Sequence, residues 1–194
     1  MNKKGLAVVW WVVIAVAVII VLYGIYGYNS FVTLNQNING KWSEVENQYQ
    51  RQADLIPNLV SVVASSVGAE TKYVKDIVDA RTSWQSAQSQ LQKDEAGVRM
   101  NNGVAALVSA VAENYPTLQA NKQYVALTDE LSGTQNRIAV ARGEYIKSIQ
   151  AYNTAVMRFP SLIIARIFGF SEKDYYKAEL SSMKTPVLGE GVLP

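Results

Sequence analysis

Apolar residues divide the chain into an unbroken opening run and a longer part in which they recur at helical spacing. The opening run extends from Leu6 to Tyr28, 23 residues without a charge. As a helix it would be about 34 Å long, enough to cross a hydrocarbon core of about 30 Å. The run therefore predicts one N-terminal transmembrane helix.

The length and the ends of this run favour a retained anchor over a cleaved signal peptide. The apolar core of a signal peptide is about 7–15 residues long and is followed by a small-residue cleavage site, which the sequence at 26–30 does not offer. Lys3 and Lys4 precede the run, so the positive-inside rule predicts a cytoplasmic N-terminus and a body outside the membrane. Aromatic residues that prefer membrane interfaces stand at both ends: Trp10, Trp11, Tyr23, Tyr26 and Tyr28.

The first stripe of spaced apolar residues follows the run without a turn signal between Tyr28 and Phe31. It predicts that the membrane helix and the first helix of the body form one continuous rod. Pro57 interrupts the stripe, which resumes at Val60, so we expect a kink there and an end at Gly68. The stripe comprises Phe31, Leu34, Ile38, Trp42, Val45, Tyr49 and Ile56.

Two shorter stripes predict a second helix near 70–92 and a third near 96–114. Tyr115 should end the third helix, because the residue before a proline avoids the helical region. The expected inward residues of the second helix are Val74, Ile77, Val78, Trp84 and Leu91, and those of the third are Val104, Leu107, Val108 and Val111.

The fourth stripe repeats every seven residues and predicts a long helix over 121–159, which Pro160 ends. A strict seven-residue repeat favours left-handed, coiled-coil-like packing. The repeat consists of Tyr124, Leu131, Ile138, Tyr145, Tyr152 and Phe159.

Together these stripes predict an all-α protein, an antiparallel up-down helical bundle preceded by the transmembrane helix. The long first and last helices should pair, with the two shorter helices covering one flank. The expected divisions are a tip at 1–5, the transmembrane helix at 6–28, the bundle at 29–170 and a tail at 171–194. We expect no regular structure over 185–194 in an isolated monomer.

An apolar segment follows Pro160. It could close the end of the bundle, lie on the membrane or contact a neighbouring subunit, and we take it as a candidate self-association surface. The residues concerned are Leu162, Ile163, Ile164, Ile167 and Phe168.

Composition narrows the chemistry. The chain has no Cys and no His, which removes thiolate chemistry, the commonest general base and the commonest transition-metal ligand. Apart from Lys3 and Lys4, the basic residues equal the 16 acidic ones in number, so no basic face is available for nucleic acid. We expect no cofactor, and the sequence identifies no catalytic residue, metal site or small-molecule substrate.

For the polar residues that could form a binding or catalytic site, we favour structural roles. Asp54 and Arg51 could form a binding site, but we favour Asp54 as a cap and Arg51 as a solvated side chain. Asn58 could bond carbonyls freed by the proline. The carboxylate pairs Asp76 with Asp79 and Asp94 with Glu95 suit a solvated, ion-paired face better than acid–base or metal chemistry.

Several motifs resemble those of the LemA family over nearly the whole chain. The most specific is Asp54, Leu55, Ile56, Pro57, Asn58, Leu59 and Val60, preceded by Arg51. Others are Tyr28 with Asn29, Trp42, the sequence at 115–121, the sequence at 136–139 with Arg142, Tyr152 with Asn153, Phe159 with Pro160, and Gly169 with Phe170. The chain departs from the family at Gln52, Ala69 and Ile146, where Arg, His and Asn are common.

The resemblance implies a membrane-anchored antiparallel bundle in bacteria and supplies no catalytic residues. We therefore expect a protein without enzymatic activity that self-associates at the bacterial inner membrane as a homo-oligomer, with the lipid bilayer as a partner. The alternative is an accessory or sensory subunit that binds a membrane-protein partner, such as a membrane protease or an envelope-stress system.

Overall fold

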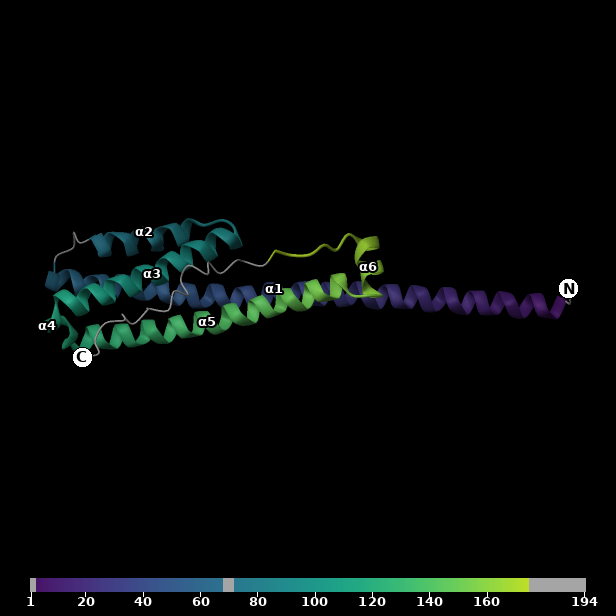
Figure 1. Ribbon diagram of the computed structural model, residues 1–194, viewed down its shortest axis with the longest axis horizontal. Helices are drawn as coiled ribbons and strands as arrows, with labels where there is room; N and C mark the ends of the chain where they lie inside the picture. Colours follow the sequence, from purple (N-terminus) through teal and green to yellow (C-terminus); the bar gives the residue numbers. More distant parts are fainter. Residues whose placement is uncertain (1–2, 68–71, 175–194) are drawn as a thin grey trace, which may run out of the picture.

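The computed structural model describes residues 3–67 and 72–174. The described part contains helices and no strand, as an all-α fold requires. The predicted helix end at Gly68, the start near residue 70 and most of the tail fall outside the described residues. The elements are α1 (Lys3–Val67), α2 (Lys72–Ser86), α3 (Gln90–Asn114), α4 (Pro116–Gln119), α5 (Lys122–Met157) and α6 (Ser161–Phe168) (Figure 1).

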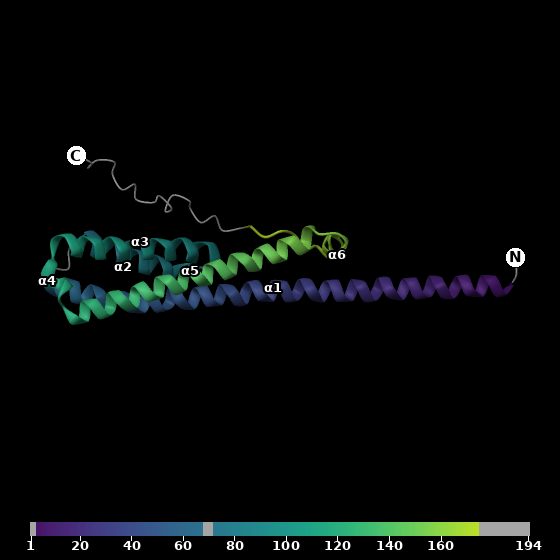
Figure 2. The same cartoon turned by 60° about the horizontal axis from the view of Figure 1, so that its bottom comes forward.

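The first helix is continuous from the apolar run to the far tip of the bundle. α1 comprises 65 residues, so the prediction of one rod is confirmed. Within the described residues it is the single helix long and apolar enough to cross a membrane, and no side chain described between Val9 and Leu22 is buried by the chain. Figure 2 shows this part of α1 projecting alone beyond the bundle.

Pro57 lies inside α1 without ending it. A proline has no N–H, so the carbonyl oxygen of Ala53, four residues earlier, loses its helical donor. The Nε of Arg81 on α2 donates to that oxygen at 2.8 Å. The expectation that Asn58 would serve this role is wrong, because its side chain is exposed and Arg81 reaches across from the neighbouring helix.

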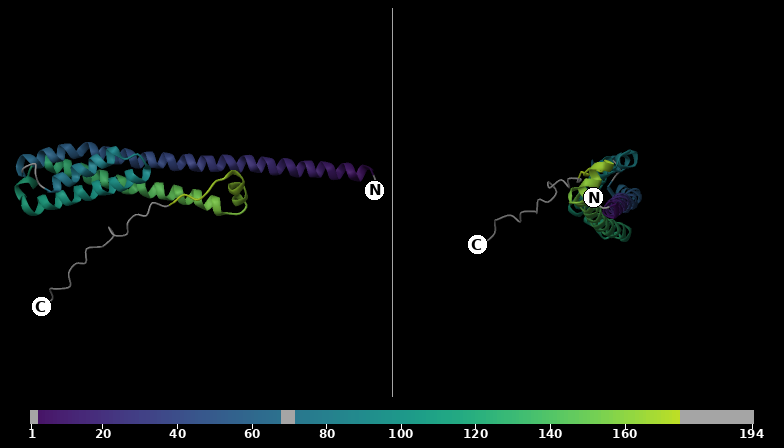
Figure 3. Two further views of the ribbon diagram at one scale, coloured as in Figure 1. Left: turned by 90° about the horizontal axis from the view of Figure 1, so that it is seen from above. Right: turned by 90° about the vertical axis from the view of Figure 1, so that its right-hand side faces the viewer.

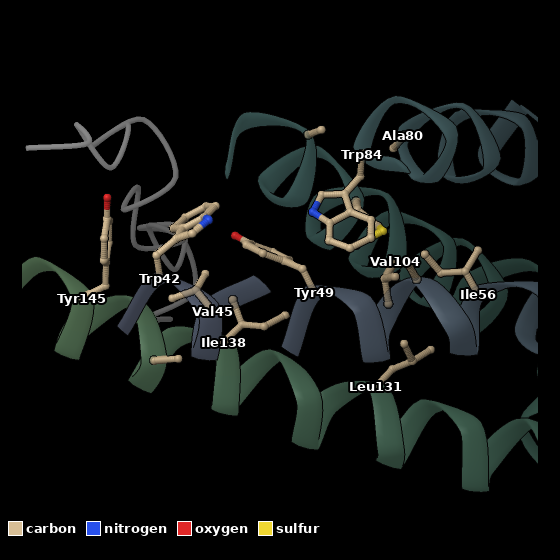
Figure 4. Packing of buried hydrophobic residues seen from close by; sticks show 14 of the residues in the cluster. Trp42, Val45, Tyr49, Ile56, Ala80, Trp84, Val104, Leu131, Ile138 and Tyr145 are labelled. Carbon is tan, nitrogen blue, oxygen red and sulfur yellow. The ribbon is translucent and has the colours of Figure 1, made fainter. Parts of the chain in front are cut away.

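α1 and α5 form the predicted long antiparallel pair, and the α2–α3 hairpin covers one flank (Figures 1 and 3). Ring contacts fix the register, with Phe31 6.2 Å from Tyr152 and Trp42 5.4 Å from Tyr145. Figure 4 shows Leu131 and Ile138 of α5 facing the core side chains of α1 and α2. The bundle fold is confirmed.

The boundary between α2 and α3 differs from the prediction. α2 ends at Ser86, and Ser89 caps α3 through a capping box in which its side chain accepts from the backbone N–H of Gln92. Leu91 therefore lies in the first turn of α3 and is 52% exposed, and Val78 is also exposed. The prediction that these two residues point inward is wrong.

The long helix predicted over 121–159 corresponds to α5 and ends earlier than predicted. α5 stops at Met157 because Arg158 takes an extended conformation, with φ −79° and ψ 136°. Tyr124 and the next four residues of the seven-residue repeat are buried. The sixth, Phe159, lies beyond the helix and is 75% exposed, so its assignment to the core is wrong.

Candidate functional site

The point where α1 leaves the apolar run carries a cluster of rings from three parts of the chain. We call it the membrane-proximal collar, and it consists of Gly27, Tyr28, Phe31, Tyr152, Ile164, Phe168 and Phe170. Phe170 stacks on Phe31 at 4.9 Å, and Tyr28 lies 5.2 Å from Phe168 and 5.7 Å from Phe170. Ring pairs at these separations add to the stability that burial provides.

Gly27 allows α6 to reach α1. A Cβ built on Gly27 would lie 2.3 Å from the Cδ1 of Ile164, so the side chain of Ile164 occupies the space that any other residue would fill. α6 ends at Phe168 and is followed by Gly169, whose φ of 76° suits glycine, and the Phe170 N–H donates to the Ala165 carbonyl at 2.9 Å. This turn directs Phe170 back into the collar.

Asn153 fastens the segment after α6 to the bundle. Its Nδ2 donates to the carbonyl of Lys173 at 2.7 Å, and its Oδ1 accepts from the Lys173 N–H at 2.8 Å. The ammonium of Lys173 lies 5.5 Å from the Tyr152 ring. The fold thus brings the motif residues Tyr152, Asn153, Gly169 and Phe170 together around one end of the bundle.

α6 has two different apolar faces. Ile164 is 4% exposed against α1, so it is not available to another molecule, and Leu162 is partly covered. Ile163, Ile167 and Phe168 are 52%, 71% and 50% exposed. These three residues remain the exposed part of the candidate self-association surface.

An apolar groove of about 410 Å³ runs between α6 and the end of the membrane run. Phe168 forms one wall, and the last two turns of the run form the other through Val21, Gly24, Ile25 and Tyr28. The position of Leu6, at the other end of the run, is within α1.

A second cluster, the internal polar cluster, lies farther along the rod and consists of Tyr49, Asp94 and Arg142. An Nη2 of Arg142 lies 3.0 Å from Oδ2 of Asp94, and the Tyr49 hydroxyl donates to Oδ1 at 3.5 Å. Burial raises the pKa of Asp94, and the neighbouring Arg142 opposes that rise. Burial likewise raises the pKa of the Tyr49 hydroxyl.

The expectation of a solvated Asp94 is wrong. Asp94 is 7% exposed because α3 starts at Gln90, which places Asp94 on the same face as the buried Gly97. The capping sequence of Ser89 and Gln92 was the signal that could have located this helix start. Gly97 touches the ring of Tyr49, since a Cβ there would lie 2.5 Å from two ring atoms.

The motif from Asp54 to Val60 is split between core and surface. Ile56 and Leu59 are fully buried, whereas Leu55 and Val60 are partly covered. Pro57 and Asn58 are exposed.

Asp54 is exposed in mid-helix and accepts from the Nε2 of Gln50 at 2.7 Å, so it is not a cap. Arg51 is not simply solvated, because its Nη2 lies 2.5 Å from Glu130 of α5. Arg51 and Asp54 therefore form no common site.

The remaining polar candidates show no catalytic arrangement. Asp76 and Asp79 line an open groove with Arg99. Among the described residues, no three His, Cys, Asp or Glu side chains gather as a metal site would require. Gln52 is fully buried between its neighbours, and its side-chain amide finds no hydrogen-bond partner within the described part of the chain.

The sequence of this chain is similar to known proteins over most of the helical bundle. The model of the LemA family matches residues 41–188. Two curated proteins of Paramagnetospirillum magneticum, magnetosome proteins MamQ 1 and MamQ 2, are each 28% identical over 196 residues, covering 86% of this chain and 72% of the relative. Magnetosome protein MamQ of Magnetospirillum gryphiswaldense is 29% identical over 186 residues, covering 83% and 68%. None of these names indicates catalysis.

Proposed function

The chain belongs to the LemA family, and on that premise we propose that it is a membrane-anchored helical scaffold that self-associates side by side. In this proposal the N-terminus is cytoplasmic, the run 6–28 spans the bacterial inner membrane, and the bundle stands upright on the outer side. The protein then acts by assembly rather than by catalysis. The relatives named magnetosome proteins are similar to this chain over most of its length, which fits a role at a membrane.

One observation carries the proposal: a single helix joins the membrane run to the tip of the bundle. α1 shows no break between Tyr28 and Phe31. A bundle on a flexible linker would sample many orientations, whereas a continuous helix limits its tilt. Neighbouring copies on such rods meet with the same faces at the same height, which reduces the entropy lost on association.

The surface for side-by-side assembly is a groove of about 470 Å³ that only α1 and α5 line. Val140 lies in this groove and is 68% exposed. Two ion pairs stand near its membrane side, Lys41 with Glu44 and Lys147 with Glu144. Positive and negative side chains thus lie at the same distance from the membrane. A second copy in the same orientation can therefore place its positive side chains beside the negative ones of the first.

Sedimentation equilibrium of the full chain in density-matched detergent tests the proposal. We expect a species heavier than the 21.4 kDa chain, and we expect Val140→Arg to lower its mass by placing a charge in the groove. Val78→Arg on α2 is the matched control, since Val78 is exposed on another helix, and it should leave the mass unchanged.

A wild-type chain that sediments only as a monomer would contradict self-association. If crosslinking in membranes instead captured one specific membrane protein under every growth condition, the scaffold proposal would give way to an accessory-subunit role.

A further inference from the structure

α6 presents an outward apolar face that no described part of the chain covers. Ile163 and Ile167 lie one turn apart on α6 and are 52% and 71% exposed, and Phe159, two residues before the helix begins, is 75% exposed. Phe168 adds a half-exposed ring. In water this face would be costly, because each exposed apolar side chain forgoes the transfer free energy of burial.

The height of α6 along the rod indicates what this face meets. Ile164 rests on Gly27, and Phe168 shares its groove with Val21 and Gly24. These positions belong to the last two turns of a run slightly longer than a hydrocarbon core is thick, so they lie at the boundary between acyl chains and headgroups. α6 lies at the same height and stands across the axis of α1 (Figure 1).

We propose that α6 is a second membrane contact, with its outward face in the outer leaflet and a phospholipid acyl chain in the groove beside Phe168. The proposal rests on the membrane anchoring proposed above but not on self-association. A helix lying in the interface typically places its apolar side about 5–10 Å below the headgroups.

The charges of this segment match phospholipid. Between Met157 and Phe170 the charged residues are Arg158 and Arg166, and both are exposed. Arginine binds phosphate through a planar, multidentate guanidinium. The two side chains can therefore reach lipid phosphates while the exposed Ile163 and Ile167 enter the acyl region.

The surroundings favour lipid over a second copy of the chain at this face. The neighbouring surface of α1 is apolar as well, with Ile25 55% and Tyr26 75% exposed. A protein interface usually has an apolar centre enclosed by a polar rim. Here the apolar face of α6 continues directly into the surface of the membrane run, as expected where both meet one leaflet.

Single-cysteine variants of the full chain test this inference, because the native chain contains no Cys. Ile167→Cys is labelled with an environment-sensitive fluorophore in nanodiscs of phosphatidylcholine and phosphatidylglycerol. Leu22→Cys reports on the anchor, and Val78→Cys, exposed on α2 away from the assembly groove, is the control outside the membrane. Quenching is measured with nitroxide lipids and with aqueous iodide.

We expect the label at position 167 to be quenched by lipid nitroxide, more strongly when the nitroxide is near the headgroup than at the acyl terminus. Position 22 should also respond to lipid, and position 78 only to iodide. Quenching at 167 by iodide alone, with 22 still responding to lipid, would overturn the role of α6 and leave the anchor intact. Shielding of 167 from both quenchers would mean that a second copy covers the face, which also overturns it. If nitroxide lipid did not quench the label at position 22, the anchoring of the chain in the membrane would itself be overturned.

The arginines supply a second measurement. Replacing Arg158→Gln and Arg166→Gln together should lower lipid quenching at position 167, because the phosphate contacts are lost while the apolar face is unchanged. Lys75→Gln, exposed on α2 at a greater distance from the membrane, should have no effect. Equal quenching in the arginine variant and the native chain would overturn the assignment of phosphate contacts.

Discussion

The membrane-proximal collar and the internal polar cluster are built on the same helix but use opposite chemistry. In the collar, rings and aliphatic side chains fill the contacts, and the adjoining outer surface is apolar. In the internal polar cluster, Tyr49 and Asp94 lie buried and Arg142 is partly buried, and the adjoining outer surface carries ion pairs such as Arg51 with Glu130. This difference fits a helix that passes from lipid into water, as proposed above, because the residues around such a helix change with its surroundings.

The two regions should also respond differently to substitution. A buried ion pair depends on both partners, because removing one leaves an uncompensated charge. An apolar contact loses only the burial that is removed, and where the collar contacts lipid, as proposed above, lipid replaces part of that burial. Variants that separate the two regions therefore test the comparison.

The largest effect is expected from Arg142→Met. It leaves the carboxylate of Asp94, which is 7% exposed, without its cation, and should lower the free energy of unfolding by about 3–5 kcal/mol. Urea unfolding of the full chain in detergent, followed by tryptophan fluorescence, measures it. Arg166→Met on the exposed face of α6 is the matched control and should change stability little; equal losses in both variants would refute the difference between the regions.

Two glycines give the next largest contrast. Gly97→Ala places a Cβ 2.5 Å from the ring of Tyr49, which cannot yield easily, and should cost about 1–3 kcal/mol. Gly27→Ala meets the end of the Ile164 side chain, which can rotate away, so global stability should fall less. The same unfolding measurement compares them, and a larger loss at Gly27 would reverse the predicted order.

A smaller loss of stability is expected at Arg81, and its size should depend on Pro57. Arg81→Met removes the donor to the Ala53 carbonyl and should cost about 1 kcal/mol. In a chain that also carries Pro57→Ala, the new backbone N–H bonds that carbonyl, so Arg81→Met should cost less. A double-mutant cycle measures this coupling, and additive losses would show that Arg81 does not serve the proline site.

The smallest effect concerns pH. The pKa of Asp94 is higher in the folded chain than its ordinary value of 3.8, so the folded state holds a proton that the unfolded state has released. Stability from this group is therefore present below pH 3.8 and falls as the pH rises through the folded pKa. The free energy of unfolding of the native chain and of Asp94→Asn is measured as the pH rises from 3.8 through the folded pKa of Asp94. The fall due to this group should appear in the native chain alone, and parallel pH dependences of the two chains would contradict the raised pKa.

The pairing of α1 with α5 was predictable because the spacing of apolar residues is a local property of each helix. Val45 and Ile138, for example, face the core as their stripes require. Phe159 failed the same rule because the proline after it disfavours the helical region for its own backbone, so its position in the repeat no longer sets its direction.

The collar and the internal polar cluster were harder to predict because they depend on contacts between distant residues. Gly27 belongs to an apolar run, and nothing in that run indicates that Ile164 will rest on it. Asp94 resembles any exposed carboxylate until the start of α3 at Gln90 fixes its face and Arg142 arrives from α5. Long-range pairing of this kind leaves no periodic signal in the sequence.

The central claim is that one unbroken helix carries the bundle from the membrane. Its most direct test is a pulsed-electron-resonance distance in nanodiscs between nitroxides on Leu22→Cys and Asn47→Cys, both exposed on α1, with labelled chains diluted in unlabelled ones. A continuous helix places the two backbone positions about 38 Å apart and predicts one narrow distribution near that value. A broad distribution, or one centred at clearly shorter distances, would show a hinge between membrane and bundle and contradict the claim.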